Sequence, residues 1–318
     1  MNRADLERIR GWTAATRAAA SHPITRFAPA PSGLLHLGHV ANAIMVWGVG
    51  RAAGGTVVLR IEDHDRSRCR PDFEARLLDD LDWLGFAPDV PTTAALRAAP
   101  SPYRQSDSET AYRDTLERLR ATGATYACRC TRSTFAAWTE DHDGPWRGPG
   151  CPGGCRRLEL AVESGLPVRI ALGEEGDEEA FDDVVLGRRS SPLADVGGDP
   201  LVRGRDGSWT YAFAVVVDDA RHGVDLVIRG SDLLDETPRQ VRLGRFLGRD
   251  DPPRFLHHPL ILKPNGAKLS KADGDTSIGD LRTAGASAET IIGRAALAIG
   301  LIERPGALRA DEVAGLFG

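Results

Sequence analysis

Apolar residues near the amino end of the chain form two short runs on either side of a longer, periodic stretch. The short runs are Thr25 to Ala28 and Thr56 to Ile61, and from Leu35 to Ala53 apolar residues recur every three or four positions. Short runs of this length are typical of buried strands, whereas the period between them is typical of a helix. The pattern predicts a strand, a helix and a second strand of an α/β fold with a parallel sheet.

Two later apolar runs also end in charged residues. Tyr211 to Val217 is followed by two aspartates, and Val224 to Ile228 is followed by Arg229. We predict both runs as further strands of the same sheet. Parallel sheets bind ligands at the carboxyl ends of their strands. A site is therefore expected where these runs end, close to the acidic segment Arg60 to Asp65 that ends an earlier run.

The middle of the chain contains a stretch of Cys, Gly and Pro whose composition differs from that of both flanks. We interpret this stretch as an insertion that splits a Rossmann-like domain. Helical spacing returns from Ala284 to Ile302, which predicts a small helical C-terminal piece. The predicted segments are an N-terminal extension (1–24), the first half of the Rossmann-like domain (25–125), the insertion (126–198), the second half (199–262) and the C-terminal region (263–318).

Net charge and composition limit where the protein can reside in the cell and which partners it can bind. The net charge is −5, and the chain shows neither an apolar run of membrane-spanning length nor an apolar signal core. We expect a cytoplasmic protein without a membrane partner, and the net charge argues against non-specific coating of nucleic acid. Three of the 40 basic residues are lysines, and all three lie between 263 and 271. Because an ammonium group is a compact, mobile point charge, this placement indicates phosphate chemistry.

The first candidate phosphate motif is His36-Leu37-Gly38-His39, at the start of the first predicted helix. A helix N-terminus offers unpaired N–H groups and a positive dipole to phosphates. Two histidines three positions apart lie on one helix face and can donate to a phosphate, while Gly38 lets a ligand approach the backbone. The alternative is that both histidines only cap and pack the helix.

The second candidate motif is Lys268-Leu269-Ser270-Lys271, which follows a Pro-Asn-Gly turn. Two mobile ammonium groups can close over the β- and γ-phosphates and neutralise charge as pyrophosphate leaves. The alternative is a solvated basic loop. The occurrence of both motifs in one chain favours phosphate binding.

Four cysteines form two close pairs, Cys128-x-Cys130 and Cys151-x3-Cys155. This spacing suits a structural zinc ion held by four thiolates, and disulfides are the weaker alternative without a secretory signal. Cys69 is interpreted as an incidental thiol. His257 and His258 lie on an apolar run and, like Trp83, Trp146 and Trp209, are interpreted as packing residues.

The two phosphate motifs resemble the HIGH and KMSKS signatures of class I aminoacyl-tRNA synthetases. The resemblance is closest to the glutamyl branch, through Arg26 to Pro29, Leu59 to Asp65, Leu81 to Gly85 and Gln105-Ser106, and it extends from Thr25 to the KLSK loop. It implies a class I synthetase α/β fold with a Rossmann-like parallel sheet split by a zinc-containing insertion. It also implies ATP with Mg²⁺ as substrate. The implied catalytic residues are His36, His39, Lys268 and Lys271, and the implied ATP-binding residues are Gly38, Leu269 and Ser270.

The resemblance also implies a glutamate site. Glu62 would receive the α-ammonium group, and Arg26, Tyr211 and Arg229 would surround the γ-carboxylate, with Ala28 in the same pocket. An arginine fork fits a carboxylate bidentately, which favours glutamate over glutamine. The alternatives are a helix cap for the glutamate, a core position for the tyrosine and an ordinary ion pair for Arg229. One departure is Ala30, where the family usually has serine.

The acceptor is predicted from the resemblance to the glutamyl-queuosine branch. About fifty residues follow the KLSK loop, which leaves no room for an anticodon-binding region, and Cys151 stands where that branch has tyrosine. The implied enzyme is a monomer that forms glutamyl-adenylate and transfers glutamate to queuosine in the anticodon stem-loop of tRNA(Asp). The alternatives are another acceptor (a tRNA 3′ end, a carrier protein or a small amine), a non-catalytic regulatory paralogue, or a nucleotidyltransferase that shares the first motif.

Overall fold

The structure is a computed structural model that describes residues 1–318 except 99, 149, 162–164, 175, 194–196 and 263–275. A helix, α1 (Arg3–Ala18), precedes β1 (Ile24–Phe27), α2 (Leu37–Ala52) and β2 (Thr56–Leu59). The two strands pair in parallel, with Arg26 opposite Val58. The predicted strand, helix, strand unit is therefore confirmed.

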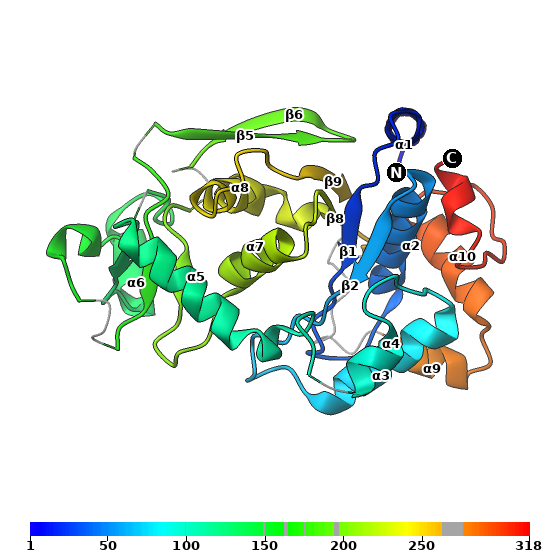
Figure 1. The fold of residues 1–318 in the computed structure, drawn as a ribbon, viewed down its shortest axis with the longest axis horizontal. Helices are drawn as coiled ribbons and strands as arrows, with labels where there is room; N and C mark the ends of the chain where they lie inside the picture. Colours follow the sequence, from blue (N-terminus) through cyan, green and yellow to red (C-terminus); the bar gives the residue numbers. More distant parts are fainter. Residues whose placement is uncertain (99, 149, 162–164, 175, 194–196, 263–275) are drawn as a thin grey trace.

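A second sheet continues beside the first, in the order β6-β5-β9-β8. Its strands are β5 (Glu178–Asp183), β6 (Gly187–Pro192), β8 (Leu226–Gly230) and β9 (Arg254–His258). β9 pairs in parallel with both β8 and β5, whereas β6 is antiparallel to β5. β8 lies next to β1 (Figure 1), because the N–H of Asp225 donates to the carbonyl of Ile24 at 3.1 Å. The ends of β1, β2 and β8 thus come together.

The prediction of a strand from Tyr211 to Val217 is wrong, because this run belongs to helix α7 (Tyr211–Arg221). Residues 213–219 of α7 are all buried. The helix packs in one apolar cluster with Leu116 and Leu119 of α5 (Glu109–Ala121) and with Leu243 of α8 (Thr237–Phe246). A helix buried on all sides has no polar face, so its apolar run cannot be told from a buried strand by periodicity.

The middle of the chain holds a separate antiparallel sheet of β3 (Thr125–Ala127), β4 (Val168–Ile170) and β7 (Leu201–Arg203). Helix α6 (Arg132–Asp141) and the short η2 (Cys155–Leu158) accompany it. The boundaries 126–198 stay a prediction, and β5 and β6, which fall within them, pair with β9 rather than with this sheet.

The remaining helices surround α2 and the strand ends. They are α3 (Pro71–Leu84), α4 (Thr93–Ala98), η1 (Gln105–Asp107), η4 (Ser231–Glu236), α9 (Ile278–Thr283), α10 (Ala288–Ala298) and η6 (Val313–Leu316). Helix α10 packs on α2, and the ring of Phe317 lies 2.4 Å from where a Cβ on Gly48 would stand. Glycine at 48 therefore lets the end of the chain close over α2 (Figure 1).

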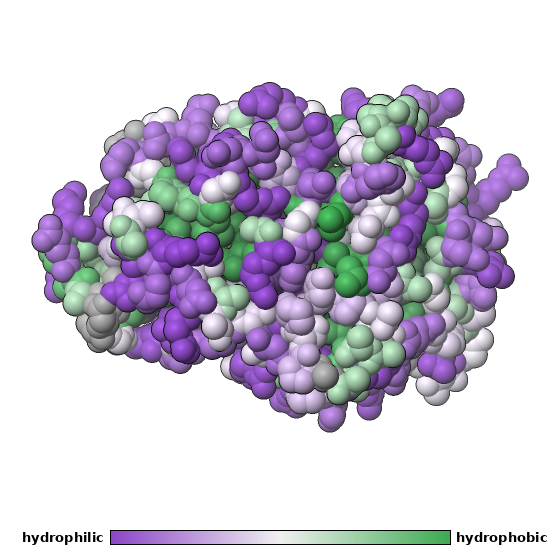
Figure 2. Space-filling model, in the orientation of Figure 1, coloured by the Kyte–Doolittle hydropathy of each residue, from purple (hydrophilic) through white to green (hydrophobic). Residues whose placement is uncertain are grey.

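Helix α1 is tied to the same region. The hydroxyl of Thr13 donates to the carbonyl of Phe317 at 2.7 Å, and the amino group of Met1 donates to the carbonyl of Ile299. Polar residues cover most of the face drawn in Figure 2. Among the described residues, no helix combines the length and the apolar character needed to cross a membrane.

Candidate active site and metal site

Three buried arginines meet at the ends of β1, β2 and β8. Arg26 lies in β1, Arg60 follows β2 and Arg229 lies in β8, and none of them is more than 4% exposed. Glu62 follows the second of these arginines, and Asp219 approaches from α7. Burying a guanidinium group is costly unless acceptors satisfy it, so the partners of each arginine define the site.

Asp219 holds two of the arginines. It accepts hydrogen bonds from Arg60 Nη1 at 2.7 Å and from Arg26 Nε at 3.1 Å, while Arg60 Nη2 donates to Glu62 at 3.0 Å. Burial alone would raise the pKa of Asp219, but Arg26 and Arg60 outweigh it and lower that pKa to about 2. Burial likewise lowers the pKa of Arg60, but the carboxylates of Asp219 and Glu62 outweigh it and raise that pKa. Asp219 and Arg60 are therefore both charged at neutral pH.

Arg229 differs from the other two because its hydrogen-bond partners are neutral. Its Nε donates to His257 Nε2 at 3.1 Å and its Nη1 to Gln240 at 2.6 Å. Its Nη2 donates to Thr237 Oγ1 at 2.7 Å and to the carbonyl of Leu233 at 3.2 Å. Across the described ranges, no ion pair within 4 Å involves this arginine, and burial lowers its pKa. A buried cation without a carboxylate partner favours an anionic ligand.

The same bonds limit what Arg229 could offer to a ligand, while its predicted place beside the γ-carboxylate stays a prediction. An arginine has five N–H groups, and four of those of Arg229 donate to the protein. A ligand carboxylate would therefore be shared with neighbouring donors. Arg26 uses Nε and Nη1 in its bonds to the described residues and has Nη2 left over. The Tyr211 hydroxyl interacts with Arg229 and lies near the charges of Glu62 and Arg26, so the structure brings the predicted glutamate-site residues together around it.

Tyr211 occupies the first turn of α7 instead of the end of a strand. Burial raises the pKa of its hydroxyl, which stays protonated and able to donate. Its ring lies 6.4 Å from that of His64, which borders a cavity of about 590 Å³ that reaches to Trp209. A larger hollow of about 770 Å³ lies away from these residues, between α1 and β5.

The two histidines of the first phosphate motif cap α2. His36 Nδ1 accepts from the N–H of Gly38 at 3.1 Å, and His39 Nδ1 accepts from the N–H of His36 at 3.1 Å. A neutral ring whose Nδ1 accepts carries its proton on Nε2. A Cβ at position 38 would stand 3.0 Å from the ring of His36, so Gly38 makes room for this cap. Both histidines therefore cap the helix, and their contact with phosphates stays a prediction.

The second phosphate motif, Lys268 to Lys271, lies outside the described residues. The chain that follows it is described and returns to the first motif. Ser277 forms an isolated bridge with His36, and the N–H of Ile278 donates to the carbonyl of Leu35 at 2.8 Å. The two motifs are thus connected through the backbone that flanks them.

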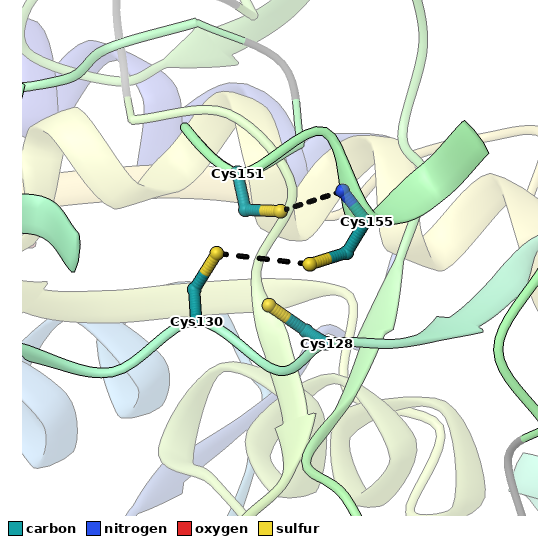
Figure 3. A group of neighbouring side chains, drawn as sticks. All are labelled: Cys128, Cys130, Cys151 and Cys155. Carbon is teal, nitrogen blue, oxygen red and sulfur yellow. Dashed lines mark hydrogen bonds between the residues drawn. The ribbon is translucent and has the colours of Figure 1, made fainter. Parts of the chain in front are cut away.

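The four predicted cysteine ligands come together beside β3 (Figure 3). Their sulfur atoms all lie within 4.8 Å of one another, and the sulfurs of Cys130 and Cys155 are 3.7 Å apart. Four thiolates at about 2.3 Å from a tetrahedral zinc ion have their sulfurs about 3.8 Å apart. All four thiols are free, which is against the disulfide alternative. Cys151 Sγ also accepts from the N–H of Cys155 at 3.2 Å.

A glycine makes this arrangement fit. A Cβ at Gly153 would stand 2.9 Å from Cys130 Sγ, and Gly154 has a φ of +62°. Because both positions lie between the last two cysteines, the loop can bring its backbone close to the sulfurs only with glycine there. The donor set and the loop therefore fit a zinc ion.

Residues 24–300 match the family described as tRNA synthetases class I (E and Q), catalytic domain. The chain belongs to this family. A protein of Symbiobacterium thermophilum named glutamyl-Q tRNA(Asp) synthetase is 43% identical over 92% of this chain and 91% of its own length. The glutamate–tRNA ligase of Thermosynechococcus vestitus is 38% identical over 82% of this chain but 54% of its own length.

A solved structure of a glutamate tRNA ligase from Elizabethkingia meningosepticum, in complex with its amino acid, has the same class I synthetase fold. It superposes with a TM-score of 0.73 at 27% identity, over 92% of this chain and 64% of that protein. The predicted fold class, a class I synthetase α/β domain, is therefore confirmed.

The sequence patterns did not single out three residues that contact the buried arginines directly or through one neighbour. Asp219 was noted only as the end of a run, and His257 was interpreted as a packing residue. Asp183, which contacts His257, was not considered. Asp183 could have been noticed from the alternation along β5, because every second residue of this strand is buried and Asp183 is one of the buried residues. A charged residue in a buried phase of a strand indicates a specific partner.

Proposed function

We propose that this chain activates glutamate with ATP and Mg²⁺ and transfers it to the queuosine at the wobble position of tRNA(Asp). The observation that carries the glutamate part is Arg229, a buried cation whose described hydrogen-bond partners are all neutral. The acceptor is supported by the 43% identity to a protein named glutamyl-Q tRNA(Asp) synthetase. We expect the enzyme to act as a monomer in the cytoplasm.

Glutamate fits the site by charge and by hydrogen bonding. Its γ-carboxylate would accept from Arg26 Nη2, from the remaining N–H of Arg229 and from the hydroxyl of Tyr211. Its α-ammonium group would face Glu62, with Ala28 lining the same pocket. Glutamine would turn an amide NH₂ toward these donors and leave buried groups unpaired, which disfavours it strongly.

The chemistry has two steps. The α-carboxylate of glutamate attacks the α-phosphate of ATP, and pyrophosphate leaves as glutamyl-adenylate forms. His36 and His39 at the N-terminus of α2, together with Lys268 and Lys271, would stabilise the charge on the phosphates. Gly38, Leu269 and Ser270 would contact ATP. A hydroxyl of the queuosine cyclopentenediol then attacks the activated carbonyl, and AMP leaves.

Zinc would have a structural role in this enzyme. Cys128, Cys130, Cys151 and Cys155 would hold it, and a four-thiolate site has no open position for catalysis. The ion would tie the loop after β3 to η2 and so stabilise the insertion.

The test is ATP-dependent transfer of labelled glutamate to total tRNA from cells with and without queuosine. We expect label only on the tRNA that contains queuosine. Label on both pools would instead favour ordinary aminoacylation of a tRNA 3′ end, and a relative 38% identical to this chain is named glutamate–tRNA ligase. Glutamate-dependent pyrophosphate exchange without transfer to either pool would reject tRNA as the acceptor.

A further inference from the structure

A buried chain of hydrogen bonds runs from Asp183 through His257 to Arg229. Asp183 ends β5 and His257 lies in β9, and both side chains are completely buried. His257 Nδ1 lies 2.7 Å from Asp183 Oδ2, and its Nε2 lies 3.1 Å from Arg229 Nε. This series of hydrogen bonds therefore ends at the Nε of Arg229.

The hydrogen bonds allow only one tautomer of His257. The carboxylate of Asp183 already accepts from three backbone N–H groups, those of Val185 and Leu186 at 2.8 Å and that of His257 at 3.1 Å. Both of its oxygens act as acceptors, so the proton of the ring must lie on Nδ1. Arg229 has only donors, so Nε2 must accept from it. If the ring carried its proton on Nε2, that N–H would face the Nε–H of Arg229, and neither group could accept.

The partners of the arginine leave its guanidinium group little freedom. Thr237 and Gln240 accept from its two terminal nitrogens, and its central carbon lies 5.3 Å from the centroid of the Phe255 ring. His257 holds the third nitrogen of the guanidinium group, Nε, by accepting its hydrogen bond. A side chain fixed before the ligand arrives loses less entropy on binding, and its donors point in one direction.

We infer that His257, oriented by Asp183, is a positioning residue that aims Arg229 at the γ-carboxylate of glutamate. This inference rests on the proposed function, because it assigns a residue to the same glutamate site. His257 does not touch the substrate in this arrangement. It acts by supplying one acceptor of defined direction to a residue that does.

Two substitutions at position 257 separate this role from packing. Asparagine can still donate to Asp183 from the place of Nδ1, but it ends short of Arg229, whereas glutamine can place an oxygen where Nε2 stood. We expect His257→Asn to raise the glutamate KM in pyrophosphate exchange about 10- to 100-fold, the effect of losing a hydrogen bond to a charged group. The ATP KM should stay within about twofold, and His257→Gln should recover most of the loss.

Asp183→Asn tests the same inference without altering the histidine. An amide NH₂ in place of Oδ2 would move the ring proton to Nε2, against the Nε–H of Arg229, so we expect the same selective rise in glutamate KM. Asp199→Asn is the matched control. Asp199 is also buried and accepts from a backbone N–H at 3.0 Å, but it lies among β3, β4 and β7.

The outcomes distinguish this inference from the function on which it rests. A rise confined to glutamate in His257→Asn and Asp183→Asn, with Asp199→Asn unchanged, supports it. Equal losses in glutamate and ATP KM, or equal losses in His257→Asn and His257→Gln, would mean a packing role and would overturn it. If the wild-type protein catalyses glutamate-dependent pyrophosphate exchange and the variants have the same glutamate KM, only the inference is overturned. If the wild-type protein shows no glutamate-dependent pyrophosphate exchange, the proposed function is overturned as well.

Discussion

Replacing Asp219 with asparagine should destabilise the fold by about 3 kcal/mol at neutral pH, the lower end of the effects expected for breaking a buried ion pair. Asp219 is 6% exposed and accepts hydrogen bonds from Arg60 and Arg26 at 2.7 and 3.1 Å. Asparagine has nearly the same shape and keeps one acceptor oxygen. The substitution therefore removes the charge and leaves the packing in place.

The pKa of this carboxyl gives an independent magnitude. Its lowering from 3.8 to about 2 corresponds to roughly 2.5 kcal/mol in favour of the folded chain above pH 4. The folded pKa lies below the unfolded one, so this stabilisation is complete above about pH 4 and is lost as the pH falls toward 2. At pH 3 about half of it remains. The difference between wild type and Asp219→Asn should shrink accordingly.

The assay is guanidinium unfolding at pH 7 and pH 3, followed by the fluorescence of the six tryptophans. Asp114→Asn, an exposed change on α5, is the control and should stay within about 0.5 kcal/mol of wild type. A loss at pH 7 of less than about 1 kcal/mol, below the usual effect of breaking a buried pair, would refute the reasoning. A loss of equal size at both pH values would refute the electrostatic cause.

Metal analysis should find about one zinc per chain; Cys151→Ser should lower that content, and Cys69→Ser, outside the cysteine cluster, should not. Gly153→Ala should weaken zinc retention against a chelator, because its Cβ would stand 2.9 Å from Cys130 Sγ; unchanged retention would contradict this geometry. Phe317→Ala should cost about 3 to 5 kcal/mol in guanidinium unfolding, the usual range for a buried phenylalanine, and a loss near zero would mean that the chain end does not close over α2.

The sequence predicted β1, α2 and β2 correctly because two independent signals agreed there. The apolar runs were short enough for strands, and the stretch between them had both the length and the period of a helix. The run from Tyr211 failed because α7 is buried along most of its length, which removes the polar face that periodicity detects. The two aspartates that follow the apolar residues belong to the same helix, and they were read instead as the residues that end a strand.

The site was predictable only where its residues form local motifs. The pairs of cysteines and the first phosphate motif could be found from their spacing. The partners of Arg229 could not, because β5 and β9 are more than 70 residues apart, and no local pattern says that Asp183 will face His257. Which buried polar residues meet is decided by how strands are ordered in the sheet, and the order β6-β5-β9-β8 is not written in any one segment.

The proposed selectivity for glutamate over glutamine would follow from how the hydrogen-bond donors of the site are divided. Arg229 commits four of its five N–H groups to the protein and also interacts with the Tyr211 hydroxyl, so it could offer a ligand at most one donor, which would donate to the oxygen of a glutamine amide as readily as to one of a carboxylate. Discrimination would therefore depend on the second ligand oxygen, which would face Arg26 Nη2. A glutamine would place its NH₂ there, donor against donor. Because Asp219 holds Arg26 through Nε at 3.1 Å, the carboxylate that stabilises the fold also orients the group that would reject glutamine.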